Sequence, residues 1–469
     1  MAEPGKNRGN LVFLAIAQLF RLGSGLAINV LLMRALGVEG FGVYGYVMTL
    51  VGLASFGASL GMERLINREL SRAPARAAEL VSAGLAATVG LSLLTGLAIV
   101  LAAAGLDGRP EVIVAAALGA TALGLQSLAT IPEAAIHASR QMRLSVRGHL
   151  TGRVALVAVT VLLVWSGAGL VSVFVAQVVD GLLTLIIIAT MYRHLDAGFV
   201  RPRRASIRAL VGEAVPFGLN LLFGSLYLSV DVLILAYMHG DAEVGAYRGA
   251  VMLIALFPII ANTLTTGVFP RMARHLGSPG AAGAELGFVS RVLLAISLPA
   301  AVGGMIVAEP LMVFLGGSDF AVSALPFAIM APLLPLRFLN NGFATTLSAL
   351  DRQGDRTRGV FLAALINIAA NLAVIPVYGA AGAAATTLAT EVVLMAWLYW
   401  RIQPVVSGLQ LFRSIIQVAI PAAVMGGALL VLPSIHVLLT VGAGVSVYAA
   451  AGWLSGAWHP RDFSRLRRV

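Results

Sequence analysis

Long apolar segments alternate with short polar connections along almost the whole chain. Most of these segments hold about 20 residues, which is the length that an α-helix needs to cross a bilayer core of about 30 Å. The pattern therefore predicts an all-α polytopic membrane protein with about fourteen transmembrane helices. The predicted spans are 10–33, 42–62, 79–105, 112–137, 148–166, 169–191, 214–238, 246–268, 288–308, 324–349, 359–377, 380–400, 414–433 and 436–457.

The first apolar segment, Leu11–Met33, carries a charge in its middle. In a helix, Gln18, Arg21 and Asn29 fall on one narrow polar stripe, and the other faces are aliphatic. A charged side chain near the bilayer centre costs about 2.5–3.5 kcal/mol on insertion scales, so Arg21 should face protein or water rather than lipid. We expect a water-filled central cavity that Arg21 supplies with positive charge. The alternative is that Arg21 pairs with a buried carboxylate only to hold helices together.

Three other predicted spans repeat this one-sided arrangement. Their polar positions are Gln126, Thr130, Glu133 and His137; Asn220, Gly224, Tyr227 and Asp231; and Arg337, Asn341, Thr345 and Ser348. Asn, Ser and Thr in membrane helices often hydrogen-bond to neighbouring helices, at about 0.6 kcal/mol each, so helix packing competes with ligand binding as their role. An arginine differs, because its planar guanidinium group suits two-point contact with phosphate oxygens. Arg21 and Arg337, one in each half, therefore favour an anionic head group.

Three acidic residues lie inside predicted spans: Asp180, Asp231 and Glu391. They could neutralise the two arginines, bind a coupling ion such as H⁺ or Na⁺, or anchor helix packing. Burial favours the protonated form of a carboxyl group, which would permit proton exchange. The residues alone leave the three roles open.

Composition agrees with the membrane prediction. The 469 residues are 59% hydrophobic and 11% charged, and the mean hydropathy is +0.92, a balance that a soluble domain does not have. We expect no cleavable signal peptide, because the polar start is short and no A-x-A-like site follows it. The chain has no cysteine, no phosphate-binding loop and no metal-ligand spacing, so we expect no metal, no cofactor and no enzyme activity.

The formal net charge of +11 follows from the distribution of the 32 Lys and Arg residues. Most lie in every second connection and in the two tails; the exceptions are Arg34, Arg109 and Arg248 in opposite connections, and Arg21 and Arg337 inside spans. This is the positive-inside pattern of a multispanning membrane protein. It predicts cytoplasmic termini and gives no reason to expect a nucleic-acid partner.

An internal repeat divides the chain. Gly37, Gly42 and Tyr44 recur as Gly240, Gly245 and Tyr247, each at an offset of 203 residues. Six predicted helices lie between the copies, so both copies have the same orientation. The repeat predicts two six-helix lobes, residues 1–208 and 209–402, with the substrate path between them. Residues 403–469 would add two C-terminal helices and a basic cytoplasmic tail.

Three stretches resemble a known family. They are RALGVEGFGVYGYVMTL (Arg34–Leu50), VPFGLNLLFGSLYLSVDVLILAYM (Val215–Met238) and NIAANLAVIPVYGAAGAAATTLATE (Asn367–Glu391). Their order and spacing resemble the bacterial polysaccharide-unit flippases, which belong to the multidrug/oligosaccharidyl-lipid/polysaccharide exporter superfamily. The likeness covers about residues 8–402.

This resemblance implies a flippase that moves undecaprenyl-diphosphate-linked oligosaccharides across the bacterial inner membrane by alternating access, for a cell-surface polysaccharide. A polysaccharide polymerase, glycosyltransferases and membrane lipid would be its partners. A multidrug or metabolite cation antiporter of the same fold is the alternative. A glycan polymerase or glycosyltransferase is less favoured, because the longest outer connection carries only Glu309 and Asp319. The candidate substrate-binding residues are Gln18, Arg21, Asn29, Asn220, Arg337 and Asn341, and the candidate ion-coupling residues are Asp180, Asp231 and Glu391.

Overall fold

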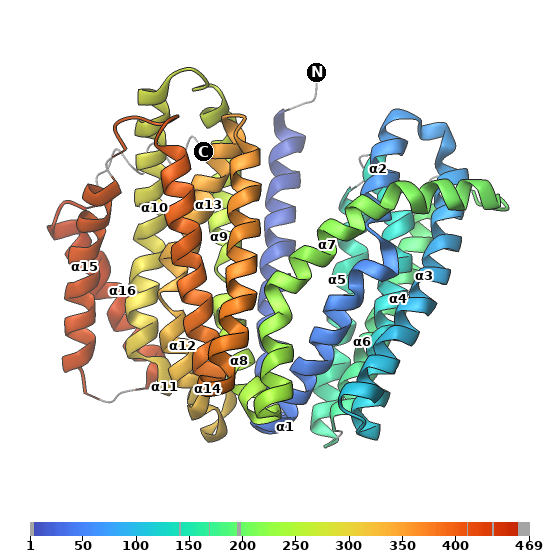
Figure 1. The fold of residues 1–469 in the computed structure, drawn as a ribbon, viewed down its shortest axis with the longest axis horizontal. Helices are drawn as coiled ribbons and strands as arrows, with labels where there is room; N and C mark the ends of the chain where they lie inside the picture. The colour runs from blue at the N-terminus through green and yellow to red at the C-terminus, as the bar shows by residue number, and fades with distance from the viewer. Residues whose placement is uncertain are drawn as a thin grey trace. The chain divides into compact units, whose positions relative to one another are not determined.

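The computed structural model describes residues 4–139, 142–167, 169–194, 198–409, 411–433 and 436–457. For residues 4–17, 19, 142–145, 147, 164, 220, 223, 224, 227 and 228 only the backbone is described. Every regular element in the described residues is helical (Figure 1). The basic tail predicted at Arg461–Arg468 lies outside the described residues.

The chain separates into two compact units, Met1–Leu233 and Ile234–Val469. The first unit contains α1 (Pro4–Ser59), α2 (Met62–Arg72), η1 (Pro74–Arg76), α3 (Ala77–Leu106), α4 (Pro110–Ala138), α5 (Met142–Trp165), α6 (Leu170–Arg193) and most of α7 (Arg204–His239). The second contains α8 (Asp241–Ile254), α9 (Pro258–Ala273), α10 (Pro279–Ile306), α11 (Ala308–Gly316), η2 (Ser318–Ser323), α12 (Ala324–Met330), α13 (Leu333–Ala349), α14 (Gln353–Ile402), α15 (Leu411–Val431) and α16 (Val437–Leu454). The predicted lobe boundaries and the cavity between lobes stay predictions.

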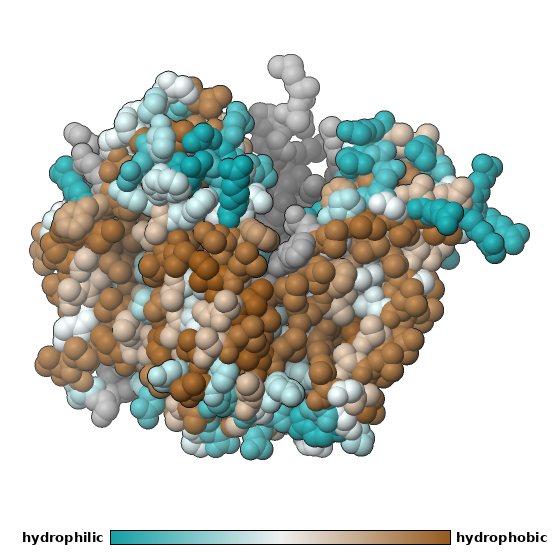
Figure 2. Space-filling view, viewed as in Figure 1, coloured by the Kyte–Doolittle hydropathy of each residue, from teal (hydrophilic) through white to brown (hydrophobic). Residues whose placement is uncertain are grey.

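The chain forms a multi-pass membrane protein. Within the described residues, nine helical segments are long and apolar enough to cross a membrane, or ten if the bent pair Ser318–Met330 and Leu333–Ala349 forms one span. On the face seen in Figure 2, each unit has a broad hydrophobic band between hydrophilic ends. Leucines such as Leu93, 71% exposed on α3, form this lipid-facing surface.

The predicted count of fourteen spans differs from nine for reasons visible in the helices. Two segments, Phe20–Arg72 and Gln353–Ile402, each cover two predicted spans, because two helices follow one another across a kink with no loop between them. Non-helical backbone at Gly37 in α1 and Gly379 in α14 marks the two connections. Two further predicted spans coincide with shorter apolar helices, Gly148–Leu163 and Ser229–His239. The exact count stays a prediction.

The sequence repeat has a structural counterpart in the backbone. Gly37 has φ 65° and ψ −175°, and Gly240 has φ 82° and ψ −171°. A residue with a Cβ atom rarely adopts this conformation, which explains glycine at both turns. Tyr44 and Tyr247, the tyrosines of the two copies, are both buried.

One predicted cytoplasmic loop is in fact helical. Residues 64–76 were expected to form a connection, but α2 occupies most of this stretch. Its apolar face (Met62, Leu65, Ile66 and Leu70) is buried in a core that also includes Ile131 and Tyr192. The arginines of the expected loop lie on the other face of an amphipathic helix.

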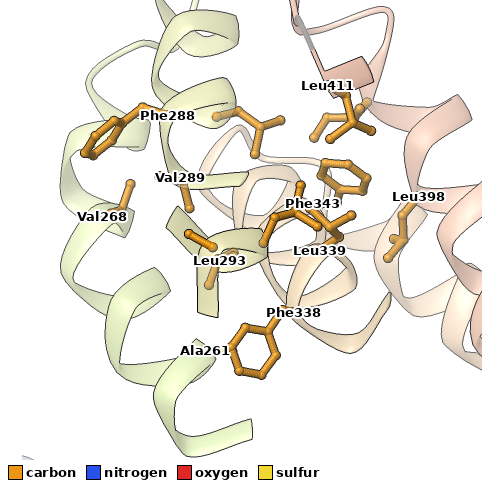
Figure 3. Close-up of a cluster of buried hydrophobic side chains, with 14 of the residues drawn as sticks. Ala261, Val268, Phe288, Val289, Leu293, Phe338, Leu339, Phe343, Leu398 and Leu411 are labelled. Atoms are coloured by element: carbon orange, nitrogen blue, oxygen red, sulfur yellow. The ribbon is translucent and has the colours of Figure 1, made fainter. Parts of the chain in front are cut away.

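The second unit is built on a core of buried aromatic and aliphatic side chains from α9, α10, α13, α14, α15 and α16. Figure 3 shows Phe338 and Phe343 of α13 packed among residues such as Leu293 and Leu398. The two C-terminal helices join this core, and the hydroxyl of Tyr448 donates a 2.9 Å hydrogen bond to the carbonyl oxygen of Ala295. Helices α15 and α16 are therefore an integral part of the second unit.

A candidate functional site: a polar cleft in the first unit

A polar cleft opens inside the apolar first unit, among α1, α4, α5 and α6. One part has a volume of about 480 Å³ and is lined by Gln18, Arg21, Gln126, Thr130, His149, Arg153, Asp180 and Thr184, with the apolar residues Val146 and Leu150. An adjoining part of about 270 Å³ is lined by Asn29, Tyr44, Gln177 and others. Gln126, Arg153 and Asp180 line both parts, so the two parts adjoin one another and are referred to together as the cleft.

The stripe predicted on the first span does line this cleft. Gln18 and Arg21 line the larger part, and Arg21 is exposed. Asn29 lines the smaller part, where its amide donates a 2.9 Å hydrogen bond to the carbonyl oxygen of Gly25, four residues earlier. Helix α1 thus turns its polar stripe toward open space, as the spacing of the residues predicted.

Arg153 is a residue of the cleft that the sequence reasoning missed. The sequence analysis counted its charge with the cytoplasmic connections, although the predicted span 148–166 includes position 153. It lies inside α5, where its guanidinium group lies next to Gly25 of α1. Its Nε atom is buried and has no hydrogen-bond partner within the described residues. A buried donor without a partner costs about 1–3 kcal/mol. An acceptor atom of a ligand that bound here would remove this cost.

His149 is the second missed residue, one turn before Arg153 on the same face of α5. Its Nε2 atom lies 2.8 Å from Glu133 Oε1 on α4, and His137 Nε2 lies 3.6 Å from the same oxygen. Glu133, one of the polar positions predicted on the span 112–137, is buried. The four-residue spacing of His149 and Arg153 is the signal that would have identified both residues.

Asp180 is the acidic residue of the cleft. It is buried in the middle of α6 and lines both parts of the cleft together with Arg153. Gly152 of α5 packs directly on it: a Cβ atom at Gly152 would lie 2.7 Å from Asp180 Oδ1. The absence of a side chain there lets α5 approach α6 closely enough to place Arg153 and Asp180 in one cleft.

The polar residues predicted in the second unit instead contact one another. Arg337 Nε of α13 donates to Glu391 Oε1 of α14 at 2.9 Å, with 27% and 7% of the two side chains exposed. Asn340 donates to Glu391 Oε2 at 2.8 Å, so each carboxylate oxygen of Glu391 accepts a hydrogen bond from α13. For Glu391, the geometry is that of the neutralising role, one of the three that the sequence left open.

Asn341 also contacts a neighbouring helix. Its amide nitrogen donates to Asn262 Oδ1 at 2.5 Å, and its amide oxygen accepts from Thr265 Oγ1 at 2.6 Å. Both partners are on α9, so Asn341 connects α13 to α9. In α14, Asn371 donates to Asn367 Oδ1 at 3.0 Å and accepts from Thr386. These contacts are of the helix-packing type.

Two predicted residues remain. Asp231 of α7 is buried, and its carboxylate accepts a 2.8 Å hydrogen bond from the backbone N–H of Val232. The side chain of Asn220 lies outside the described residues. Asp355, at the start of α14, is buried and paired with Arg352 Nε at 3.0 Å and with Arg401.

Comparison with solved structures defines the class of protein. The lipid II flippase MurJ, in an inward closed conformation, matches with a TM-score of 0.77 over 94% of this chain and 98% of that chain, at 12% sequence identity. An inward-facing multidrug resistance MATE family transporter of the MOP superfamily matches with a TM-score of 0.64 over 84% of this chain and 98% of that chain, at 14% identity. At these identities the likeness shows the fold alone, which is that of MurJ-like and MATE-like membrane proteins.

The family follows from sequence. A model described as "polysaccharide biosynthesis protein" matches residues 8–276, more than half of the chain, and the chain belongs to that family. It is 22% identical over 376 residues to the probable low-salt glycan biosynthesis flippase Agl15 of Haloferax volcanii, covering 80% of this chain and 79% of that protein. It is 25% identical over 236 residues to the probable flippase AglR of the same organism, covering 48% of each. The family expected from the three sequence stretches is confirmed.

Proposed function

We propose that the protein is a flippase that translocates oligosaccharides linked to a polyprenyl diphosphate, undecaprenyl diphosphate in a bacterial host. The observation that carries this proposal is the cleft in the first unit, which combines two arginines with amide and hydroxyl side chains. The names of the two Haloferax volcanii relatives and the MurJ-like fold support it.

The chemistry of the cleft suits the head of such a lipid. A diphosphate is a dense anion with many acceptor oxygens, and an arginine can contact two of them at once. Arg21 is exposed, and the Nε atom of Arg153 is a buried donor without a hydrogen-bond partner among the described residues, so each arginine has a donor that can bind oxygen. Gln18, Gln126 and Thr130 in the same wall could hydrogen-bond sugar hydroxyls. The polyprenyl tail would stay in the bilayer.

Arg337 has a different proposed role. It was predicted to share the diphosphate with Arg21, but its ion pair with Glu391 must break before it can do so. Removing one partner of a buried pair costs several kcal/mol. We therefore place the anion contact on Arg21 and Arg153 and assign Arg337 to the packing of α13 on α14.

We also propose a topology and a transport cycle for this flippase. We propose fourteen spans in two six-helix lobes with two added helices, both termini in the cytoplasm, a bacterial inner-membrane location, and alternating access of the binding site. Cargo would shift the populations of the two states only through different affinities for them. Asp180, which lines the cleft beside Arg153, is the proposed site for a coupling H⁺ or Na⁺. The protein would make and break no covalent bond. Glycosyltransferases would act before transport and a polymerase after it.

A reconstituted flipping assay tests this function. Proteoliposomes would receive a fluorescent lipid-linked oligosaccharide, and quenching from outside would report its movement between leaflets. Transport of the diphosphate-linked sugar, and none of a neutral glycolipid with the same sugar, is the expected result. Equal transport of both, or transport of organic cations instead, would contradict the proposal.

A further inference from the structure

The smaller part of the cleft is a polar pocket in its own right. Its volume is about 270 Å³, and helices α1, α4, α5 and α6 of the first unit line it. Its neutral polar side chains are Asn29, Tyr44, Gln126, Thr160 and Gln177. Amide and hydroxyl groups suit a ligand rich in hydroxyl groups, because they both donate and accept hydrogen bonds. The charged residues of this part, Arg153 and Asp180, also line the larger part.

Thr160 of α5 has a buried hydroxyl group without a partner. The residue is 1% exposed, and its Oγ1 atom forms no hydrogen bond within the described residues. A threonine inside a helix often bonds to the carbonyl oxygen one turn earlier, as Thr49 does to Gly45 at 2.8 Å. Thr160 therefore has an unmet hydrogen bond in the wall of the pocket, which a ligand hydroxyl would satisfy.

The amides of the pocket are also incompletely bonded. Among the described residues, Gln177 Nε2 on α6 has Met48 Sδ as its hydrogen-bond partner, at 3.5 Å, and a thioether sulfur is a weak acceptor. Asn29 uses its amide nitrogen within α1, and no described residue donates to its amide oxygen. Side chains from three helices, α1, α5 and α6, therefore bring hydrogen-bonding groups to one space.

Tyr44 forms an aromatic wall of this pocket. It is buried, and its ring centroid lies 5.6 Å from that of Phe174 on α6 and 5.9 Å from that of Phe41. A Cβ atom at Gly119 would lie 2.9 Å from Val51 Cγ2 and 3.4 Å from the Phe174 ring, so α4 packs directly against this wall. An aromatic surface next to amide and hydroxyl groups suits a sugar ring, which has apolar C–H faces and a polar rim.

We propose that this part of the cleft binds one neutral pyranose ring, the sugar joined directly to the diphosphate. This placement rests on the proposed function, which puts the diphosphate at Arg21 and Arg153. Because Arg153 lines both parts, the sugar next to the diphosphate is the one that reaches the smaller part. A volume of 270 Å³ corresponds to about nine water molecules, which is room for one ring and not for two.

The lining also selects among sugars. Asp180 lies in the same pocket, so a sugar with its own carboxylate would place two negative charges close together. A ligand without hydroxyl groups opposite Thr160 and Gln177 would leave their hydrogen bonds unmet, and binding sites reject such ligands strongly. The first sugar is therefore a condition for binding, whereas sugars farther along the oligosaccharide lie outside this pocket.

Binding of defined lipids to the purified full chain in detergent tests the proposal. The probes are undecaprenyl diphosphate and the same lipid carrying one glucose, galactose, N-acetylglucosamine or glucuronic acid. At least one neutral sugar should tighten binding by about tenfold over the bare diphosphate lipid, as two or three hydrogen bonds would, and glucuronic acid should not. If no neutral sugar tightens binding, or if glucuronic acid tightens it as much, the sugar site is overturned.

T160V and Q177M locate the sugar, because each keeps the size of the side chain and removes its strong hydrogen-bonding groups. Each should reduce the advantage of the neutral-sugar lipid over the bare lipid by about threefold to tenfold, the effect of one neutral hydrogen bond. T88V is the matched control, since Thr88 of α3 also has a buried hydroxyl without a partner among the described residues and does not line the cleft. An unchanged advantage in T160V and Q177M would overturn the site.

The melting temperature without lipid separates a binding role of Thr160 from a structural one. T160V should melt at the temperature of the unchanged protein or above it, because no described residue bonds to Thr160 Oγ1. A lower melting temperature with an equal loss of binding to both lipids would assign Thr160 to helix packing and overturn its role.

The bare lipid separates this proposal from the proposed function. If undecaprenyl diphosphate binds and the sugar brings no advantage, the sugar site alone fails. If neither the bare lipid nor any sugar-bearing lipid binds, the proposed function fails and the sugar site with it.

Discussion

The arginines inside the membrane helices have different surroundings in the two units. In the first, Arg21 and Arg153 line an open polar cleft, and the Nε atom of Arg153 has no partner among the described residues. In the second, Arg337 is held by Glu391, which is also held by Asn340. Arg337 is hydrogen-bonded to a carboxylate within the packing of α13 on α14, whereas Arg21 and Arg153 line open space. We propose that this open space leaves the two arginines of the first unit available to an anion.

The largest expected effect is on the free energy of unfolding, when the ion pair of the second unit is broken. E391A leaves the partly buried Arg337 guanidinium group without its carboxylate, which should lower the free energy of unfolding by about 3 kcal/mol. This value is at the lower end for buried pairs, because 27% of the Arg337 side chain is exposed. Thermal or denaturant unfolding in detergent measures it. R337M/E391L, which replaces the pair by apolar side chains, should recover most of the loss. If E391A alone is as stable as the unchanged protein, the packing role of the pair is refuted.

The second effect concerns function in the first unit. R153Q removes a charge-assisted contact to phosphate, which is worth about 1.5–3 kcal/mol, so lipid-linked oligosaccharide flipping should slow by about tenfold to a hundredfold. Stability should fall little, because the Arg153 Nε atom has no hydrogen-bond partner among the described residues and glutamine keeps a polar side chain beside Asp180. R109Q, in a predicted outer connection, is the charge-matched control. Flipping by R153Q at the rate of the unchanged protein would argue against the cleft as the anion site.

The third effect concerns the shape of the cleft. In G152A the new methyl group meets Asp180 and Thr184, so α5 must move away from α6, at about 1 kcal/mol or more in unfolding free energy. The displacement carries Arg153 with it, so flipping should slow as well. G212A, at an exposed glycine of α7 with open space around it, is the control. Normal flipping by G152A would show that the spacing of α5 and α6 does not set the position of the arginine.

The smallest effect separates packing from ligand binding at Asn341. As a connection between α13 and α9, this side chain should contribute about 0.6 kcal/mol, so N341A should be slightly less stable and should flip cargo normally. Unfolding and flipping measured on one preparation decide the matter. Unchanged stability with slower flipping would instead support the sugar-binding role predicted from the sequence.

The sequence predicts the features that depend on residues close together along the chain. The polar stripe of Gln18, Arg21 and Asn29 lines a cleft as its helical spacing indicates. The repeat at Gly37 and Gly240 reproduces one backbone conformation, because a positive φ selects glycine locally. Membership of the polysaccharide biosynthesis family was also readable from short stretches.

What the sequence does not predict depends on contacts between distant residues. Glu391 lies 54 residues from Arg337, and nothing in either helix indicates which of the acidic residues faces the arginine. Arg153 was missed for another reason: its charge was counted with the preceding basic connection, although the predicted span 148–166 includes it and α5 begins earlier still, at Met142. The sequence alone does not decide whether a charge this close to a predicted helix end belongs to the connection or to the helix.

Flipping by two charge-altered proteins in the same proteoliposome assay tests the difference between the units most directly. R21Q/R153Q removes the arginines of the cleft, and R337M/E391L removes the paired charges of the second unit. We predict that the first protein loses lipid-linked oligosaccharide transport while remaining folded, and that the second retains it. Transport by R21Q/R153Q at the unchanged rate, with transport lost in a folded R337M/E391L protein, would contradict the assignment of the anion site to the first unit.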